Sequence, residues 1–584
     1  MEGLNRRQLI QRAALASGAL ALGPAFWRRA VASAATVTDG PYGPLGPPDA
    51  LGIRLPSNFQ ARLIARGTET VPGTTYPWHV QSDGQSTYGT RDGGWILVTN
   101  SEAPPPAGGA SAIRFKPDGS VSDAYRILTG TTLNCSGGRT PWGTWLSGEE
   151  VDDTDYIPGA LPASLALSGN PFRGAMWECD PTQASQGVRR PALGLFKHEA
   201  VCVDPFGQKL YLTEDVADGC LYRFSPDLYP DLSAGLLEVA LVAGDGSVTW
   251  KEVPNPTPPP GTTPTRDQVP EATRFERGEG IWFDSGMVYL ATTRDSKLHA
   301  YDTVNQRHEV IYDGKAQADG PLTDPDNITV SPSGDLFVCE NTSGDDGGLD
   351  IALLTPDLTI SRFLRVEGPK HIYKAPELGP SELTGVVFDP SGTRMYFTSQ
   401  RARTTESGDE PGPGEVYEIT GPFRNERPRL GPLSPGNPRE SGQSIGPGQG
   451  ADGSQVTGAA LGVELPRRIG LDTLRRRGLP VALTLDEAAT VDVRLHARFR
   501  PRHTPAARRR IRHRRRYAMA AARRSYDTRG PRLLRVPLAR QGARLLGNRR
   551  EALRMIAEVT VTDRQGDRDR FVRTVLVTAP ARKR

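Results

Sequence analysis

Carboxylate-bearing residues recur at the ends of similar short segments, and this recurrence is the clearest indication of chemistry in the sequence. Each segment is an apolar run that closes on a polar or charged cluster. The six segments are LVTNSE at 97–102, WLSGEE at 145–150, YLTED at 211–215, YLATTRD at 289–295, FVCEN at 337–341 and YFTSQR at 396–401. If the ends of such segments converge in space, their carboxylates repel one another, and bound cations are the simplest way to neutralise them.

The spacing of these segments predicts the elements that position them. A period of roughly 40 to 50 residues with several short strands per unit is typical of a β-propeller, in which each blade repeats one path around a central axis. The sequence therefore predicts an all-β chain with a six-bladed propeller over residues 35–427. We expect its channel to collect carboxylates from the segment ends: Glu102, Glu149, Glu150, Glu214, Asp215, Asp295 and Glu340.

Polar clusters also precede the first strand of five units. They read LNCSGGRTPWGTW at 133–145, FKHEAVCVDPFG at 196–207, RGEGIWFD at 277–284, DPDNITVSPSG at 324–334 and SELTGVVFDPSG at 381–392. Their chemically active residues are Cys135, His198, Glu199, Arg277, Glu279, Asp326, Asn327 and Glu382. A repeat that served only packing would place similar residues at these positions. This set instead consists of metal ligands and one guanidinium.

Several of these residues have two interpretations. His198 either ligates a metal or packs and orients Glu199, and Arg277 can form an ion pair with Glu279. Glu214 and Asp215 either coordinate calcium or cap a blade turn. The chain has five cysteines, an odd number for an exported protein. The four other than Cys135 are therefore either buried thiols or members of one or two disulfides.

The N-terminal residues differ in composition from the repeats. Arg6 and Arg7 precede an Ala/Leu-rich stretch, and small residues follow at 32–34, which predicts a twin-arginine signal over residues 1–34. The apolar stretch is far shorter than the roughly 20 residues that cross a bilayer. We find no other segment apolar enough for a transmembrane span, so we expect an exported protein that is periplasmic, at the cell surface or secreted.

The C-terminal part is strongly basic. Residues 428–458 are rich in Gly, Pro and Ser and predict a linker. Residues 459–584 carry 33 Lys and Arg against 11 Asp and Glu, a balance of +22 that leaves −18 for the first 458 residues. Alternating apolar and polar residues predict a small β-sandwich-like domain, with two strands in 481–499 and a hairpin in 555–579.

Within this domain, residues 506–524 form a basic block that is either an exposed arm or a helix with a basic face. Such a block either attaches the protein to an anionic polymer of the cell wall, to extracellular DNA or to lipid headgroups, or is merely solvated. No aromatic residues alternate with its charges in the manner of a base-stacking surface, so sequence-specific nucleic-acid recognition is not expected.

Taken in order, the motifs between residues 40 and 425 resemble those of the PhoX-type alkaline phosphatases. The resemblance rests on NCSGG with TPWGTWLSGEE, KHEAVCVD with YLTEDVADGCLYRF, an Arg-x-Glu before a strand, PDN before a strand ending in CEN, and the closing GEVYEITGPF. It implies a six-bladed propeller, twin-arginine export, and iron and calcium ions in the channel. It also implies that small phosphate esters are the substrates.

The resemblance also implies roles for individual residues. Cys135 would bridge irons, Glu150, Glu199 and Glu279 would ligate the cluster, and Arg277 would be the catalytic residue beside the phosphate. With the residues expected from the repeat, the predicted metal ligands are Cys135, Glu149, Glu150, Glu199, Glu279, Asp326, Asn327 and Glu340, and the further candidates are His198, Glu214, Asp215 and Glu382. Arg401 and Arg403 are additional phosphate-binding candidates by location.

Two other classes of protein fit parts of the pattern. One is a different calcium-dependent six-bladed hydrolase, such as a lactonase, although that chemistry has no use for a thiolate at Cys135. The other is a non-catalytic, metal-stabilised binding protein of the cell surface, which the basic C-terminal domain would suit.

Overall fold

The computed structural model describes the chain from residue 35 to residue 578 with internal gaps. The gaps are 105–106, 153–172, 206, 285, 318–319, 342–346, 357, 374–380, 406–409, 425–459, 466–467, 486–488, 500–514, 527–529, 547–552 and 564–567. The predicted signal at 1–34 and the predicted linker at 428–458 therefore lie outside the described residues.

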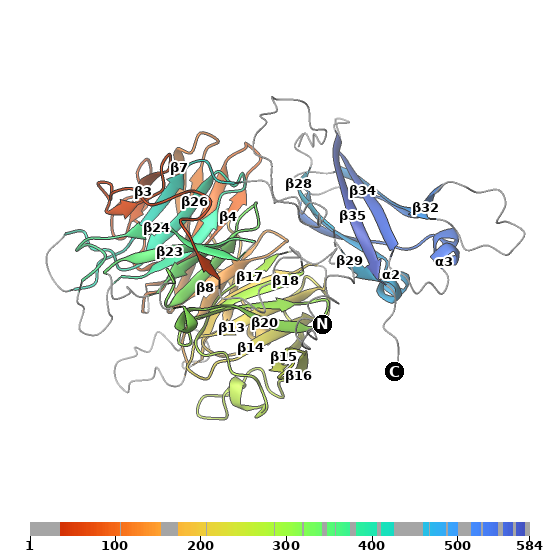
Figure 1. Cartoon of the computed structure of the whole chain (residues 1–584), viewed down its shortest axis with the longest axis horizontal. Coiled ribbons are helices and arrows are strands. Elements are labelled where there is room, and N and C mark those ends of the chain that lie inside the picture. Colours follow the sequence, from red (N-terminus) through yellow and green to blue (C-terminus); the bar gives the residue numbers. More distant parts are fainter. Residues whose placement is uncertain are drawn as a thin grey trace, which may run out of the picture.

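Six antiparallel sheets form the blades of a β-propeller, as the repeat predicted (Figure 1). The first three blades are β4 (Ser82–Gly89), β5 (Trp95–Ser101), β6 (Gly108–Phe115) and β7 (Val121–Thr131); β8 (Asn134–Arg139), β9 (Trp145–Glu149), β10 (Met176–Cys179) and β11 (Val188–Arg189); and β12 (His198–Asp204), β13 (Lys209–Glu214), β14 (Leu221–Pro226), β15 (Gly235–Val242) and β16 (Val248–Glu252).

The other three blades follow the same path. They are β17 (Gly278–Asp284), β18 (Met287–Thr292), β19 (Lys297–Asp302) and β20 (Arg307–Asp313); β21 (Pro325–Val330), β22 (Leu336–Glu340), β23 (Leu349–Leu354) and β24 (Thr359–Val366), extended by β1 (Thr36–Val37) and β2 (Ile53–Arg54); and β25 (Leu383–Phe388), β26 (Arg394–Ser399), β27 (Glu415–Thr420) and β3 (Gln60–Arg66).

The first strand of each blade lies at the centre. These inner strands contact one another in the order β4, β8, β12, β17, β21 and β25, and β25 contacts β4 in turn. The outer strand of the sixth blade is β3, which comes from the N-terminal side of the chain and pairs antiparallel with β27. Hydrogen bonds also join the first and last blades, from Trp95 Nε1 to the Tyr396 hydroxyl at 3.0 Å and from Thr398 Oγ1 to the Ser82 carbonyl at 2.6 Å.

The C-terminal residues form two further sheets (Figure 1). One contains β28 (Ala460–Glu464), β30 (Leu479–Leu485) and β33 (Gly530–Val536); the other contains β29 (Arg468–Gly470), β35 (Arg568–Thr578), β34 (Leu553–Asp563), β31 (Ala489–Phe499) and β32 (Arg515–Tyr526). Side chains of both sheets share one apolar core, including Val481 and Val536 of the first and Val493 and Val559 of the second. This agrees with the predicted sandwich-like domain. The described residues of this domain also include two short helices, α2 (Leu471–Arg477) and α3 (Arg540–Leu546).

The prediction for the basic block at 506–524 was wrong where the structure describes it. Residues 515–524 belong to strand β32, which pairs along its length with β31, and are neither an arm nor a helix. The physical reason is the apolar stretch between the arginines, because Met519 and Ala520 are buried in the core of the domain. Residues 506–514 lie in one of the gaps.

A cavity of about 720 Å³ lies along the inner strands. Residues from the inner strands of all six blades line it, among them Thr87, Gly138, Val203, Trp282 and Val387. Residues of the C-terminal domain line it as well, namely Leu465, Ile469, Arg477, Pro480 and Arg535. A hydrogen bond of 2.5 Å from Arg535 Nη2 to Gln208 Oε1 also joins the two parts of the chain.

Candidate metal centre

A β-bulge near the start of the inner strand positions one chemically active residue in each of five blades. The pairing between the first and second strands shifts by one residue in every blade, and the first residue within the shift is Asp83, Cys135, Glu199, Glu279 or Asp326 in blades 1 to 5. A bulge interrupts the alternation of side chains and so redirects one of them. In blade 6 the shift lies between Thr384 and Val387, and Gly385 within it has no side chain to offer.

The second strands supply a further set of residues. The residue that directly follows the second strand is Glu102 in blade 1, Glu150 in blade 2 and Asp215 in blade 3. The same place in blades 4 to 6 holds neutral residues, which are Thr293, Asn341 and Gln400. At the position directly after the second strand, carboxylates therefore occur only in the first three blades.

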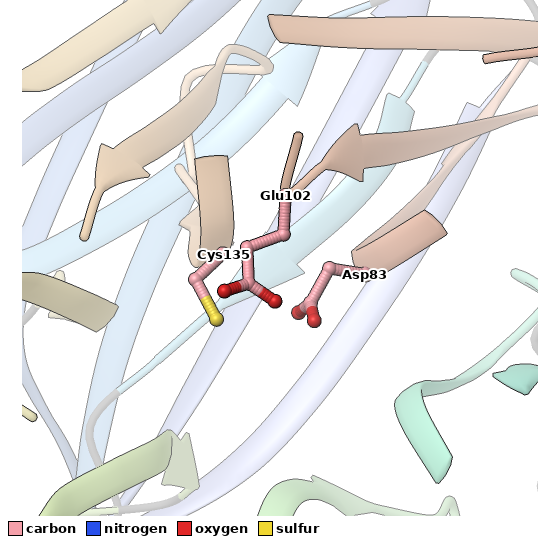
Figure 2. Close-up of side chains that lie close together, drawn as sticks. All are labelled: Asp83, Glu102 and Cys135. Atoms are coloured by element: carbon pink, nitrogen blue, oxygen red, sulfur yellow. The ribbon is translucent and has the colours of Figure 1, made fainter. Parts of the chain in front are cut away.

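Seven of these residues form what we call the ligand ring: Asp83, Glu102, Cys135, Glu150, Glu199, Glu279 and Asp326. They make three overlapping groups, Asp83 with Glu102 and Cys135, Cys135 with Glu150 and Glu199, and Glu199 with Glu279 and Asp326. Within each group the candidate ligand atoms all lie within 4.8 Å of one another. Figure 2 shows the first group, with the Cys135 sulfur and the two carboxylates directed toward a common space.

Glu199 shows most directly that the ring suits cations. Its side chain is fully buried, and neither carboxylate oxygen has a hydrogen-bond partner among the described residues. Burial raises the pKa of Glu199 well above its ordinary value, and the adjacent carboxylates of Glu279 and Glu150 raise it further. A buried carboxylate without a partner costs several kcal/mol, of the order found for buried unpaired ions, unless it is protonated or binds a cation.

The remaining ring residues are shifted in the same direction. Burial raises the pKa of Asp83, with Glu102 and Glu382 adding to the effect. Burial, followed by repulsion from Glu382, raises the pKa of Glu102 to about 7. The pKa of the Cys135 thiol also rises, because of burial and then because of the nearby Asp83 and Glu199 charges. Cations would reverse each of these shifts by favouring the charged forms.

The donor set also fits the expected metals. Carboxylate oxygens are hard ligands that suit calcium, whereas a thiolate is a soft ligand that suits iron and is a poor ligand for calcium. Cys135 belongs to two of the three groups, so its sulfur is placed to contribute to two neighbouring sites. All five cysteines are buried and none forms a disulfide, which resolves the two interpretations in favour of free thiols.

Three of the predicted or candidate carboxylates that lie outside the ring groups contact residues of their own blades. Glu149 Oε2 accepts a hydrogen bond from the Ala175 amide at 3.2 Å, and Glu340 accepts from the Thr323 hydroxyl at 2.6 Å and from the Asp350 amide at 3.0 Å. Glu214 accepts from the Tyr222 hydroxyl at 2.7 Å and pairs with Arg266. Each is the last residue of a second strand, so its side chain points away from the one that follows it.

Asn327, Glu382 and His198 lie beside the ring. The Asn327 amide donates to Asp326 Oδ1 at 2.6 Å and its oxygen accepts from the Gly385 amide at 2.7 Å, so in this structure Asn327 orients a ring carboxylate. Glu382 pairs with Arg401 at 3.0 Å. His198 donates from Nε2 to the Gly194 carbonyl at 3.0 Å and packs against Phe196, and burial lowers its pKa to about 3.

Arg277 contacts two acidic residues. Its Nε and Nη2 atoms donate to the two oxygens of Asp215 at 2.8 Å each, and Nη2 is also 3.1 Å from Glu279 Oε1. Burial raises the pKa of Asp215, but the hydrogen bonds from Arg277 outweigh this effect and hold the pKa below its ordinary value. Arg277 thus has the ion pair that the sequence analysis considered, and 38% of its side chain remains exposed beside the ring.

A hollow of about 480 Å³ adjoins this part of the ring. It is lined by Glu150, Lys197, Asp215, Val216, Ala217, Asp218, Arg266 and Arg277. Arg266 is held by three carboxylates, Asp152 at 3.1 Å, Glu214 at 3.2 Å and Asp218 at 3.3 Å. Lys197 Nζ is 3.4 Å from Glu150 Oε1. The hollow therefore contains three cationic side chains, of which Lys197 and Arg277 contact the ring carboxylates Glu150 and Glu279.

Sequence reasoning missed Asp83, Lys197 and Gln400. Asp83 stands in the opening Ser82-Asp83-Gly84 of the first blade, at the place that Cys135 occupies in Asn134-Cys135-Ser136, so aligning the blade openings would have found it. Gln400 donates to Asp83 and to Glu102, at 2.5 Å in each case. Lys197 directly precedes the inner strand of blade 3, as Arg277 precedes that of blade 4, so aligning the blade openings would have found it too.

The inner strands of this propeller, with the residues that follow the second strands, bring together six carboxylates and one thiol in groups that could hold metal ions. Residues 78–314 match the protein family described as Alkaline phosphatase PhoX, which confirms the resemblance seen in the motifs. The matched segment contains every ring residue except Asp326. The family match supports a phosphatase.

The solved structures that match the chain share little sequence with it. A luciferin-regenerating enzyme is 13% identical with a TM-score of 0.32, covering 62% of this chain and 95% of its own. A putative 6-phosphogluconolactonase from Bacteroides uniformis is 14% identical with a TM-score of 0.30, covering 62% of this chain and all of its own. The calcium-binding protein regucalcin from Agrobacterium tumefaciens is 12% identical with a TM-score of 0.32, covering 63% and 98%. No curated protein matches the chain significantly.

Proposed function

We propose that the protein is an exported, metal-dependent phosphatase that hydrolyses phosphate mono- or diesters at iron and calcium ions held by the ligand ring. The observation that carries the proposal is the juxtaposition of the buried thiol of Cys135 with the unpartnered carboxylate of Glu199 in one group of candidate ligands. A lactonase-like calcium site would need no thiolate. A purely structural ion would need no adjoining hollow with cationic walls.

In this proposal Cys135, Glu150 and Glu199 hold iron, while the oxygen ligands Asp83, Glu102, Glu279 and Asp326 hold calcium. When bound, such ions supply positive charge that binds phosphate oxygens and stabilises the charge that develops during hydrolysis. Other residues of the chain hold the ring carboxylates in position. Asn327 fixes the orientation of Asp326, Gln400 bridges Asp83 and Glu102, and Thr293 donates to Glu279 at 2.8 Å.

Arg277 is the proposed phosphate-binding residue. Its planar guanidinium can donate two parallel hydrogen bonds to phosphate oxygens, as it already does to the oxygens of Asp215. Arg401 is less suited to this role because only 12% of its side chain is exposed, against 38% for Arg277, and its Nη1 donates to Glu382 and to Gln400. Arg403 is unsuited because it stacks on Tyr373 and donates to the Pro369 carbonyl.

We further propose export by the twin-arginine route and attachment of the basic C-terminal domain to an anionic polymer of the cell wall. The support for export is the Arg6-Arg7 pattern with its short apolar stretch. The described part of the chain contains no helix that is both long and apolar enough to cross a membrane. The support for attachment is the local charge of +22 over residues 459–584.

The test is to measure iron and calcium in the purified protein and phosphate release from an aryl phosphate and a bis-aryl phosphodiester. We expect both metals and turnover of at least one ester. The variant Cys135→Ser is compared with the control variant Cys202→Ser. The control alters another buried thiol, which lies outside the ring groups. Iron content and activity that are equal in the two variants would contradict the proposed role of the ring.

A further inference from the structure

The bulge that carries Cys135 leaves backbone groups without partners in their own sheet. The pairing of β8 with β9 shifts at this point, so Cys135 and Ser136 together face the single residue Gly148. The carbonyls of a bulge fall outside the regular ladder of hydrogen bonds. Since a buried carbonyl without a donor is destabilising, another part of the chain must supply one.

Asn100 of the neighbouring blade is that donor. Its Nδ2 atom donates to the Cys135 carbonyl at 2.9 Å and also to the Ser136 carbonyl. Its Oδ1 atom accepts hydrogen bonds of 2.9 Å from Trp145 Nε1 and from the Ser147 hydroxyl, both of which belong to β9. The side chain of Asn100 is fully buried. One residue of blade 1 therefore holds both strands of the bulge in blade 2.

Hydrogen bonds of the same kind join other blades near the ring. They run from a threonine at the end of one second strand to a carbonyl in or beside the next bulge: Thr213 Oγ1 to Glu279 at 2.6 Å, Thr293 Oγ1 to Pro325 at 2.9 Å, and Thr398 Oγ1 to Ser82 at 2.6 Å. Each accepting residue is a ring residue or directly precedes one. A threonine has one hydroxyl to donate, whereas Asn100 donates to two carbonyls, and it does so at the bulge that carries the thiol.

The direction of the Cys135 side chain depends on this bulge. Side chains alternate between the two faces of a regular strand, and the extra residue of a bulge interrupts that alternation. If the bulge relaxed into regular pairing, the side chains of Cys135 and Ser136 would change direction. Bonds that fix both carbonyls of the bulge therefore also fix where the sulfur lies.

We propose that Asn100 is a positioning residue for the metal centre, which directs the Cys135 thiol into the ligand ring by holding the bulge from the neighbouring blade. This inference rests on the proposed function for the role of the thiol as a metal ligand. It adds that the soft ligand of the ring, and with it the preference for iron, depends on one neutral side chain that does not itself reach the ring.

The test compares two variants of nearly equal shape, Asn100→Thr and Asn100→Val, in the full-length protein. Threonine occupies the same penultimate place of the second strand in blades 3 and 6, as Thr213 and Thr398. It keeps one donor that valine lacks, so the difference between the variants reports the hydrogen bond and not the packing. The control is Thr87→Val, which removes a bond of 2.6 Å from the buried Thr87 hydroxyl to the Phe388 carbonyl, between blades 1 and 6 and outside the bulges.

The first readout is the reactivity of the thiol in the metal-free protein. Alkylation of Cys135 by iodoacetamide is followed by mass spectrometry of its peptide, with the buried Cys202 as an internal reference. We expect Cys135 to react about 10-fold faster in Asn100→Val than in the wild type, as for the loss of a hydrogen bond to a buried carbonyl, and at an intermediate rate in Asn100→Thr. Equal acceleration at Cys135 and Cys202 would identify Asn100 as a general structural residue and overturn the proposal.

The second readout is the binding of cadmium alone to the same metal-free proteins. A thiolate bound to cadmium absorbs in the ultraviolet by charge transfer, and carboxylate ligands give no such band. We expect the band in the wild type and in Thr87→Val, its absence in Cys135→Ser, its loss for the most part in Asn100→Val and its partial return in Asn100→Thr.

A band in Asn100→Val as strong as that of the wild type would overturn the proposal. If valine prevents folding, Asn100→Thr is compared with the wild type, and an unchanged alkylation rate and band in that variant would equally count against it. If the wild type itself gives no band, the proposed role of Cys135 as a metal ligand fails, and the alkylation rates still decide whether Asn100 positions the thiol.

Discussion

Replacing Glu102 by glutamine should have opposite effects in the metal-free and the metal-loaded protein. In the absence of cations the half-buried Glu102 carboxyl is desolvated and repelled by Glu382, and its pKa rises from 4.5 to about 7. A raised pKa of an acid means that the folded state binds the proton more tightly than the unfolded state does. The stability due to that proton is therefore fully present below about pH 4.5 and is lost as the pH rises to about 7.

The size of the effect follows from the two pKa values. Their difference of about 2.5 corresponds to about 3 kcal/mol of unfolding free energy, at 1.36 kcal/mol for each pKa unit. Glu102→Gln removes the ionisation. The metal-free variant should therefore be more stable than the metal-free wild type by up to about 3 kcal/mol at pH 8, and this advantage should disappear at pH 4.

The assay is urea unfolding of the chelator-treated proteins at pH 4, 6 and 8, repeated at pH 8 with metals restored. With metals restored we expect the order to reverse, because the variant has lost a ligand. Glu252→Gln on an exposed part of β16 serves as the control for removing one acidic charge. Metal-free Glu102→Gln that unfolds like the wild type at both pH 4 and pH 8 would refute the electrostatic account of the ring.

Four further outcomes are expected. Cys135→Ser should lose iron and phosphatase activity while keeping a folded propeller, which metal analysis and circular dichroism would check against Cys202→Ser. Glu199→Gln should reduce metal occupancy and lower the melting temperature of the loaded protein, and chelator should leave the variant less affected than the wild type. Arg277→Met should lower turnover more than metal content, as measured on the same preparation, and equal losses would assign it to the ring instead. Truncation after Phe423 should abolish salt-sensitive retention on an anionic polymer and leave turnover near normal; loss of turnover at full metal content would show that the C-terminal domain completes the site.

The sequence predicted the architecture and most of the ring because the blades repeat. Each apolar run ending in a polar cluster became a second strand, and the polar openings became inner strands. The repeat did not show in which direction each side chain points. Glu149 and Glu150 are adjacent and chemically identical, yet one contacts the Ala175 amide within blade 2 and the other joins the ring.

The direction of each side chain depends on how two strands pair, and the residues of one strand alone do not define that pairing. The bulge at Cys135 exists because Asn134 pairs with Glu149 while Gly137 pairs with Ser147, a mismatch of one residue that only the paired strands define. Asp83 escaped notice for the same reason, since nothing in Ser82-Asp83-Gly84 alone distinguishes a bulge from a turn. Lys197 occupies the place in blade 3 that Arg277 occupies in blade 4, but its closeness to Glu150 comes from the contact between blades 2 and 3.

The pairing of β3 with β27 sets the order of events during folding. Residues 60–66 complete a sheet whose other strands end at residue 420, so this sheet cannot form until nearly the whole propeller has been synthesised. Contacts this distant in sequence form slowly, since the loop between them must close first. Gln400 of the last blade reaches Asp83 and Glu102 of the first across this same junction. The nascent chain therefore carries all seven ring residues before the strand that pairs with β3 has been made, and the propeller can close only after that strand is available.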